Sequence, residues 1–238
     1  ISGGVRMTDF LSDGYSMLAI NSADPAAPQP GRSESGAILP QTPHPILGDL
    51  RVRQAIAQGI DTTRLLREIY GAGAAPLTSW VLPTAPWAFA ADLPTYRFDP
   101  EAARVLLDEA GWNLVAGSNT RTRNGARLAL AIVTNDDNPE RMRLAGGMRD
   151  ALNALGFEAT VSALPFAQAA DLILQQRFDL ALLGWENAGP DPALGAYFDS
   201  RNDLPGSGVN VTSFQKPIVD TLFAAARTAP GCDPAVRG

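Results

Sequence analysis

In its second half the sequence alternates short apolar runs with amphipathic stretches, and this alternation limits the possible folds most strongly. Apolar runs at 128–134, 157–164 and 180–183 have the length of buried strands. The stretches between them, 138–156 and 167–177, carry apolar residues at helical spacing. Strands separated by single helices are joined by crossover connections and pair in parallel. The sequence therefore predicts an α/β fold with a mixed, partly parallel sheet flanked by helices.

Further elements are predicted on either side of this alternating run. Residues 14–22 form an apolar stretch between turn formers, which predicts a strand. Two short helices are expected to meet near Gly59, and another begins at Asp99, where a capping residue precedes a proline. A last helix begins at Lys216. Its expected apolar face is formed by Ile218, Val219, Leu222, Phe223 and Ala226.

Two polar segments are predicted to lie at the surface. Residues 23–47 are rich in proline, with glycine and serine between, and predict a long, mobile surface loop. This loop contains the one histidine, His44, which we expect to be solvated because no catalytic partner stands near it in the sequence. The cationic run at 121–127 predicts a turn between strands with solvated side chains.

Residues 78–98 combine prolines with aromatic residues. Extended chain, with the rings packed on neighbouring helices, is the expected structure. An aromatic wall of a ligand site is the alternative. The aromatic residues are Trp80, Trp87, Phe89, Tyr96 and Phe98.

The composition excludes several classes of protein. The net charge is −6 and the isoelectric point is near 4.8; because nucleic-acid-binding proteins carry a basic face, no nucleic-acid partner is expected. The single cysteine, Cys232, excludes an internal disulfide and a cysteine-based metal cluster. No apolar run approaches the roughly 20 residues that a membrane-spanning helix needs.

The candidate site is the loop that follows the strand at 180–183. Ligands of open α/β sheets bind at the carboxyl ends of strands, and this strand delivers Trp185 to that end. Trp185 offers a flat apolar face and one N–H donor. Glu186, Asn187 and Asp191 supply polar groups beside it. The alternative is a core tryptophan that ends a strand.

Little in the sequence supports catalysis. A nucleophile with its base is poorly supported, because the chain has one histidine and one cysteine. Glu186, Asp191 and Asp199 could form a pair of the kind that glycosidases use, or they could cap turns and the following helix. The carboxylates match no Ca²⁺ or Mg²⁺ loop. We expect no cofactor and no metal.

Several stretches, taken in order, resemble the extracellular solute-binding proteins of the peptide/nickel ABC-transporter class, family 5. Residues 49–61 resemble the family's D-x-R-V-R-Q-A-I signature with its following I-D. Residues 96–112 resemble its Y-x-x-D-P…A-G-W segment, and residues 178–192 its G-W…D-P segment. Gly208 and Asn210 match a later G-x-N.

The resemblance implies a receptor with two lobes that close over a solute, peptide-like or other, and deliver it to a permease of the inner membrane. It implies a periplasmic or extracellular protein, with or without a membrane anchor through a lipidated N-terminus outside this chain, and we expect a monomer. Trp185 would pack on the solute, with Glu186, Asn187, Asp191 and Asn210 as further ligand-binding residues.

The ends of the sequence suggest a piece of a longer protein. It begins without Met, and the helix start at Asp233 is followed by only five residues. We therefore expect a strand and Pro-rich loop leading from a missing lobe in 1–48, an α/β solute-binding lobe in 49–230, and the start of a truncated helix in 231–238.

One departure from the family bears on the solute. In peptide-binding members, the resemblance implies an Asp three residues after the loop tryptophan, where it accepts the peptide amine. Here that residue is Ala188. A buried ammonium without a carboxylate partner is disfavoured, so a peptide with a free amine would need Glu186 or Asp191 as a substitute partner, at a different reach. The other hypotheses are a hydrolase that uses Glu186 and Asp191 and a solute sensor without transport.

Overall fold

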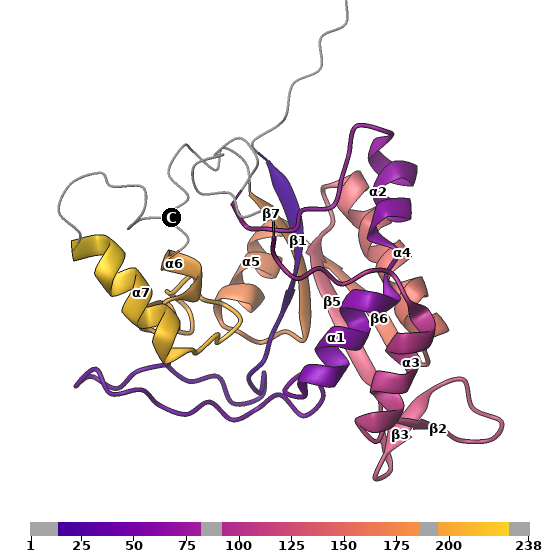
Figure 1. Cartoon of the computed structure of the whole chain (residues 1–238), viewed down its shortest axis with the longest axis horizontal. Helices are drawn as coiled ribbons and strands as arrows, with labels where there is room; N and C mark the ends of the chain where they lie inside the picture. The colour runs from indigo at the N-terminus through magenta and orange to yellow at the C-terminus, as the bar shows by residue number, and fades with distance from the viewer. Residues whose placement is uncertain (1–13, 82–91, 186–194, 229–238) are drawn as a thin grey trace, which may run out of the picture.

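The computed structural model describes residues 14–81, 92–185 and 195–228. A four-stranded sheet in the order β1-β7-β5-β6 lies at the centre (Figure 1). Strand β5 pairs in parallel with β6 and β7, and β1 pairs antiparallel with β7 at one edge. The predicted mixed, partly parallel sheet is therefore confirmed. Its strands are β1 (Tyr15–Ile20), β5 (Ala129–Asn135), β6 (Glu158–Leu164) and β7 (Leu180–Trp185).

The helices begin close to the residues that the sequence indicated. Asp49, Asp61, Asp99 and Asn138 each accept a hydrogen bond from a backbone N–H of the helix that follows, as capping residues do. The helices are α1 (Leu50–Gly59), α2 (Thr62–Tyr70), α3 (Pro100–Glu109), α4 (Pro139–Ala154), α5 (Phe166–Leu174), α6 (Gly195–Phe198) and α7 (Pro217–Thr228), with a 3₁₀ turn at Ser200–Asn202. A small second sheet contains β2 (Asn113–Leu114), β3 (Arg121–Arg123) and β4 (Ala126–Arg127).

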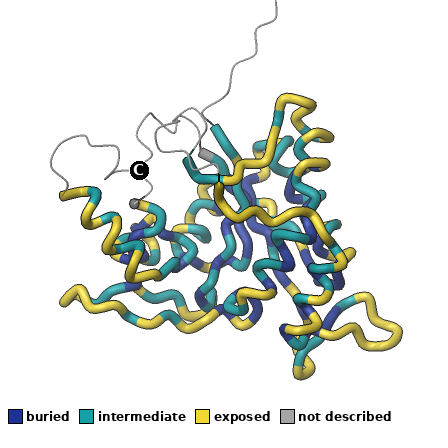
Figure 2. The backbone as a smooth tube through the Cα atoms, viewed as in Figure 1, coloured by how far each residue is buried: buried dark blue, intermediate teal, exposed yellow. Residues whose placement is uncertain are grey.

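Alternate residues of the central strands face two different cores. Ile132 and Leu182 lie in the larger core with helices α1, α3 and α4, whereas Val133 and Leu183 lie in a smaller core with α5. This follows from the period of two along a strand. The two inner strands, β5 and β7, are largely buried on both faces (Figure 2), and each fully buried Leu or Ile contributes roughly 1.5–3 kcal/mol to stability.

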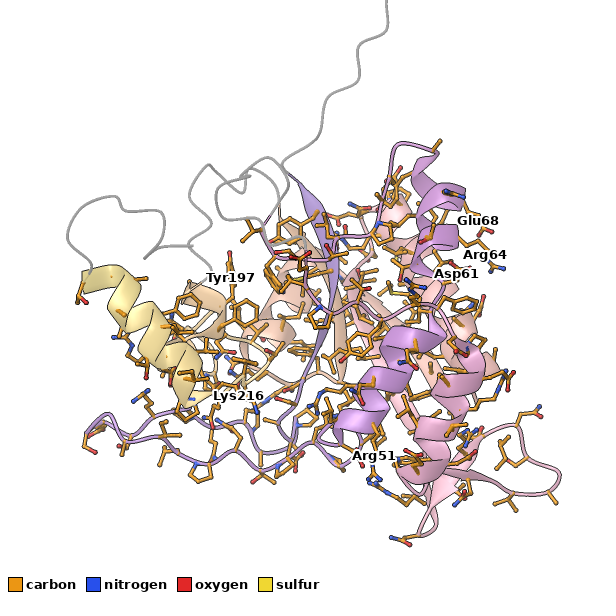
Figure 3. All side chains as sticks on the ribbon, in the orientation of Figure 1. Arg51, Asp61, Arg64, Glu68, Tyr197 and Lys216 are labelled. Carbon is orange, nitrogen blue, oxygen red and sulfur yellow. The ribbon has the colours of Figure 1, made fainter. Side chains whose placement is uncertain are left out.

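Helix α2 buries Leu65 and exposes much of its outer side. Asp61, Arg64 and Glu68 lie along its outer side (Figure 3). The Arg64 and Glu68 side chains are 3.4 Å apart and both solvated, so this pair contributes only about 0.5 kcal/mol or less.

The Pro-rich segment, 23–47, lies at the surface as predicted, but several contacts hold it there. It runs along the lower edge of the molecule from β1 out to α7 and back to α1 (Figure 1). The Arg32 guanidinium lies 2.9 Å from the Asp220 carboxylate of α7 and donates to Ser200 Oγ at 2.8 Å. Gln41 donates to the Asp203 carboxylate at 3.0 Å. The mobile loop expected from the composition is therefore packed against the C-terminal part of the chain.

His44 is buried, so its expected solvation is wrong. Only 4% of the residue is exposed. Its Nδ1 accepts the backbone N–H groups of Ile46 and Leu47 at 3.0 and 2.9 Å, and its Nε2 lies 3.0 Å from Asp179 Oδ1. Because Nδ1 accepts, Nε2 carries the hydrogen and donates to the carboxylate. The other oxygen of Asp179 accepts the N–H of Ala131 in β5.

The expectation for the cationic run at 121–127 is partly wrong. The turn expected within 121–127 is present, with positive φ at Asn124 and Gly125. Arg121, however, is buried and donates to the carbonyls of Leu155 and Trp112 and to Asp108.

The apolar face expected on α7 is partly wrong. Ile218 and Leu222 are 65% and 62% exposed, and α7 is mostly exposed in Figure 2. Asp220 faces inward instead, where it accepts from Arg32 and from the Ser200 N–H and Oγ–H. The helix is therefore fixed by a polar contact that its apolar periodicity did not indicate.

A buried carboxylate joins the Pro-rich segment to the loops behind the smaller core. Asp203 is fully buried, and its two oxygens accept from the side-chain amides of Gln176 at 2.8 Å and Gln41 at 3.0 Å, with Gln215 at 3.5 Å. Burial raises the pKa of the Asp203 carboxyl, and the hydrogen bonds from these side chains and Ser213 oppose the shift. These side-chain partners are neutral donors, so an acceptor is required here.

We expect Asp203→Asn to lower the free energy of unfolding by about 2 kcal/mol near pH 7, because the new NH₂ group must face a donating amide. The folded-state pKa of Asp203 is raised, so its stabilising contribution is present at low pH and is lost as the pH rises through that pKa. The difference between wild type and variant should therefore grow as the pH falls from about 7 to about 4. Urea denaturation over this range measures it; a difference that stays constant or shrinks contradicts the assignment.

Candidate functional site

A cavity of about 450 Å³ opens between the sheet, α5, α6 and the loop around 209–212. Small-molecule sites commonly enclose roughly 300–1,000 Å³. Most of the side chains around it are apolar. The described residues that line it are Met17, Leu18, Ala19, Ile20, Trp80, Thr134, Asn135, Arg141, Phe166, Ala169, Ala170, Ile173, Leu174, Leu182, Leu183, Gly184, Tyr197, Phe198, Val209, Val211 and Thr212.

The cavity lies at the end of the sheet where strands β5 and β7 terminate. Asn135 is the last residue of β5, and Gly184 precedes the last residue of β7. Because β1 runs antiparallel to β7, its first residue, Tyr15, pairs with Trp185 at the same end of the sheet. Three strands thus bring residues far apart in the sequence to one place, as the strand-end argument predicts.

Aromatic rings form one side of the cavity. The Trp80 ring centroid lies 4.9 Å from that of Phe198 and 5.6 Å from that of Tyr197. The Tyr15 ring packs edge-on against Trp80, with the two centroids 6.0 Å apart. Tyr197 extends from the upper side of α6 in Figure 3. Burial, with a smaller effect of Tyr197, raises the pKa of the Tyr15 phenol to about 12, so Tyr15 stays a neutral hydroxyl at physiological pH.

For residues 78–98 the sequence left two alternatives open, extended chain with packed rings or an aromatic wall of a ligand site, and the structure differs along the segment. Trp80 lines the cavity, which favours the aromatic wall at this position. Tyr96 and Phe98 are about half exposed and lie in irregular chain. Trp87 and Phe89 lie outside the described residues.

Polar groups form another part of the cavity wall. Thr134 Oγ donates to the Leu182 carbonyl at 3.0 Å, which ties β5 to β7. Arg141, in the first turn of α4, donates from Nη1 to Asn135 Oδ1 at 2.5 Å. The Asn135 amide in turn donates to Asp137. Arg141 is the one charged side chain among the described lining residues.

The structure describes only some of the predicted site residues. The backbone of Trp185 ends β7 beside the cavity, so its predicted position at the strand end is confirmed. Its side chain is not described. Glu186, Asn187 and Asp191 lie outside the described residues, and so does Ala188. Their roles in binding stay predictions.

Asn210 lies next to the cavity wall and holds the loop that forms it. It is fully buried, and its side-chain amide donates to the carbonyls of Phe214 and Asp199 while its oxygen accepts the Phe214 N–H. Its neighbours Val209 and Val211 line the cavity. A direct ligand contact by Asn210 stays a prediction, and the observed bonds position the loop.

Asp199 has a structural role in the described part of the chain. Burial would raise the pKa of its carboxyl, but hydrogen bonds and charge from Arg201 outweigh this and hold the pKa below its usual range. Arg227 adds an ion pair at 3.1 Å. Since Asp199 also caps the following 3₁₀ turn, its oxygens are occupied, as the capping alternative predicts.

Sequence reasoning missed Arg141 and Asn135, although one signal was available. The first turn of a helix favours acidic residues because of the helix dipole, and Arg141 stands there, three residues after the cap Asn138. A cation at that position is unfavourable for the helix alone. Arg51 and Arg64 also stand in the first turns of α1 and α2, so this signal alone did not single out Arg141.

Metal and membrane signals are lacking within the ranges 14–81, 92–185 and 195–228. No group of three or more His, Cys, Asp or Glu side chains there could hold a metal ion. No helix in these ranges is both long and apolar enough to cross a bilayer.

Comparison with known proteins gives a consistent family. The model of bacterial extracellular solute-binding proteins, family 5 (middle), matches residues 3–203. The probable di/tripeptide-binding protein 5 of Pseudomonas aeruginosa (strain UCBPP-PA14) is 30% identical over 190 residues, covering 79% of this chain and 34% of the relative. The dipeptide-binding protein of Escherichia coli K12 is 25% identical over 185 residues, covering 76% and 32%.

Solved structures share the fold. The oligopeptide-binding protein AppA of Bacillus subtilis, in complex with a nonapeptide, matches with a TM-score of 0.73 at 18% identity, over 93% of this chain and 40% of AppA. NikA of Brucella suis, in complex with Fe(III)-EDTA, matches with a TM-score of 0.74 at 20% identity, over 94% and 41%.

The chain spans about a third of the length of the relatives it matches. The family model nevertheless covers most of the chain. The chain belongs to the bacterial extracellular solute-binding proteins of family 5.

Proposed function

We propose that this chain forms one lobe of the substrate-binding component of an ABC importer, which captures a small solute and delivers it to a membrane permease. The observation that carries the proposal is the cavity at the ends of β5 and β7, next to Trp185, in a chain of this family. The names of its relatives, which are peptide-binding proteins, support a peptide-like or other small solute.

The mechanism is binding without chemistry. Trp185 and Trp80 supply apolar surface for the solute, and Glu186, Asn187 and Asp191 supply polar contacts from the loop that follows β7. Closure of a second lobe over this cavity excludes water, which strengthens the polar contacts. The family match and the relatives favour this function over the hydrolase alternative.

The family description as extracellular supports a periplasmic or extracellular location. A monomer and a lipid anchor outside this chain complete the proposal. Both are consistent with a receptor that must diffuse between solute and permease.

Trp185→Ala is expected to weaken solute binding by roughly tenfold or more, because it replaces the large apolar ring proposed to pack on the solute by a methyl group. The measurement has two steps on the full-length protein: a thermal-shift screen against peptides, acylated peptides, opines, sugars and metal chelates, then calorimetric titration with the hits. Tyr96→Ala, an exposed aromatic outside the cavity, is the control and should bind normally. Unchanged affinity in Trp185→Ala refutes the role of Trp185, and a screen without any hit refutes the proposed function.

A further inference from the structure

The cavity at the sheet end also continues along strand β1. Four consecutive residues of this strand, Met17 to Ile20, line it. Met17 pairs with Leu183, and Ile20 pairs with Leu180, the first residue of β7. Since a strand rises about 3.3 Å per residue, this part of the cavity follows β1 for roughly 10 Å. The cavity therefore extends from the end of the sheet, where Trp185 stands, along the side of the sheet.

Helix α5 and the loop at 209–212 form the walls opposite β1. Ala170 and Ile173 line the cavity from one face of α5, as residues three positions apart in a helix do. The loop is fixed beside the end of β1, because the N–H and hydroxyl of Ser22 donate to the Thr212 carbonyl at 3.3 and 2.8 Å. We call this part of the cavity the apolar extension, formed by Met17, Ala19, Ile20, Ala170, Ile173 and Val211.

Several large apolar residues of the cavity wall are exposed to solvent. Phe166 and Leu174, at the two ends of α5, are 65% and 36% exposed, and Val209 is 40% exposed. Large apolar residues that are exposed around one cavity indicate a binding surface. Because the release of water from apolar surface is favourable, an apolar group that enters between β1 and α5 binds there by burial alone.

The sheet end of the same cavity is polar. Thr134 and Asn135, the last two residues of β5, line it, and so does Arg141 of α4. A solute that fills the cavity thus contacts polar groups where the strands end and aliphatic side chains along β1. The extension is long in the direction of one strand, which suits a chain better than a compact ring system.

We propose that the apolar extension binds an aliphatic chain of the solute, so that the preferred solute is amphiphilic, with its polar part at the sheet end and its tail between β1 and α5. An acylated peptide has this chemistry. Ala170 determines the specificity, because its methyl group leaves the space that a larger side chain on this face of α5 would occupy. The inference rests on the proposed function, because it names the solute class of the same cavity.

The test measures binding of one peptide with acyl chains of increasing length, by calorimetry on the full-length protein. The probes are alanyl-alanine carrying an N-acetyl, N-butanoyl, N-hexanoyl or N-octanoyl group, so that only the apolar chain changes along the series. Each methylene that enters the apolar extension should tighten binding roughly two- to fourfold. The affinity should stop rising once the chain has filled the extension.

Variants of α5 locate the effect in the cavity. Ala170→Leu should weaken binding of the octanoyl probe by roughly tenfold or more and leave the acetyl probe within about twofold of wild type, because leucine fills the space of the tail. Ala170→Val should lie between the two. Ala167→Leu is the matched control, since Ala167 is exposed on the same helix and does not line the cavity. Thermal unfolding of each variant separates lost binding from lost folding.

Each outcome bears on the inference. An affinity that rises with chain length in wild type and in Ala167→Leu, and no longer rises in Ala170→Leu, supports it. Equal affinity along the series, a rise that survives in Ala170→Leu, or a loss that Ala167→Leu shares overturns it and leaves solute binding standing. If none of the four probes binds, the inference is overturned; the proposed function fails only if the wider solute screen is silent as well.

Discussion

Replacing Gly208 by alanine is expected to lower the free energy of unfolding by about 3 kcal/mol or more. A Cβ at this position would lie 2.0 Å from the carbonyl oxygen of Asn202 and 2.8 Å from the backbone nitrogen of Leu204. These are backbone atoms, so no rotamer change relieves the contact. The same Asn202 oxygen accepts the N–H of Asn210 at 3.1 Å, and moving it breaks the bond that sets the cavity loop.

Gly146→Ala is the matched control for this prediction. Gly146 lies inside α4, and a Cβ there would meet nothing within 4 Å. Alanine is favoured over glycine in a helix by roughly 0.5–1 kcal/mol, so the same substitution should stabilise the protein at this site. Urea denaturation of both variants gives the comparison. A Gly208→Ala protein within about 0.5 kcal/mol of wild type would show that the loop tolerates a side chain.

The outcome for Gly208 also bears on the cavity. Asn210 is held by Phe214 and by the Asp199 and Asn202 backbone, and Val209 and Val211 on either side of it line the wall. Displacing Asn202 would therefore shift Asn210 and the cavity wall beside it, because a hydrogen bond joins the two residues. The G-x-N motif matched in the sequence thus combines a close approach of two backbones with the side chain that fixes the turn.

What the sequence predicted correctly was specified by neighbours along the chain. The strand at Ala129–Asn135 is an apolar run of strand length, and α4 is marked by the cap Asn138 and a proline directly after it. Parallel pairing followed from the single helices between strands. The location of the candidate site at the end of β7 followed from the same argument, since Trp185 stands directly after the apolar run.

What the sequence did not predict depends on partners distant along the chain. The Asp179 partner of His44 is 135 positions away. The buried partners of Arg121 include a carbonyl 34 positions away, and the inward direction of Asp220 depends on Arg32, 188 positions away. No local period or cap reports such pairs. Solvation was predicted for His44 and for the cationic run that contains Arg121, and long-range hydrogen bonds overrode it.

His44→Ala is expected to lower the free energy of unfolding by about 3 kcal/mol, because it strips three polar groups of their partner at once. The N–H groups of Ile46 and Leu47 lose their acceptor, and Asp179 Oδ1 loses its donor. Leu47 is fully buried in the larger core and Ile46 nearly so, so water reaches these N–H groups only if the core side chains move. The missing imidazole also leaves a cavity that adds to the cost.

His44→Asn separates these contributions. The Asn Oδ1 can stand in for Nδ1 and accept the N–H groups of Ile46 and Leu47, as short polar side chains do in turns, but the contact with Asp179 is lost. We expect this variant to recover about half of the loss. Urea denaturation compares the two variants with wild type. If His44→Ala is as stable as wild type, the Pro-rich segment is a surface connection after all; if only His44→Asn regains stability, the turn at Ile46 and Leu47 ties this segment into the core on which the cavity is built.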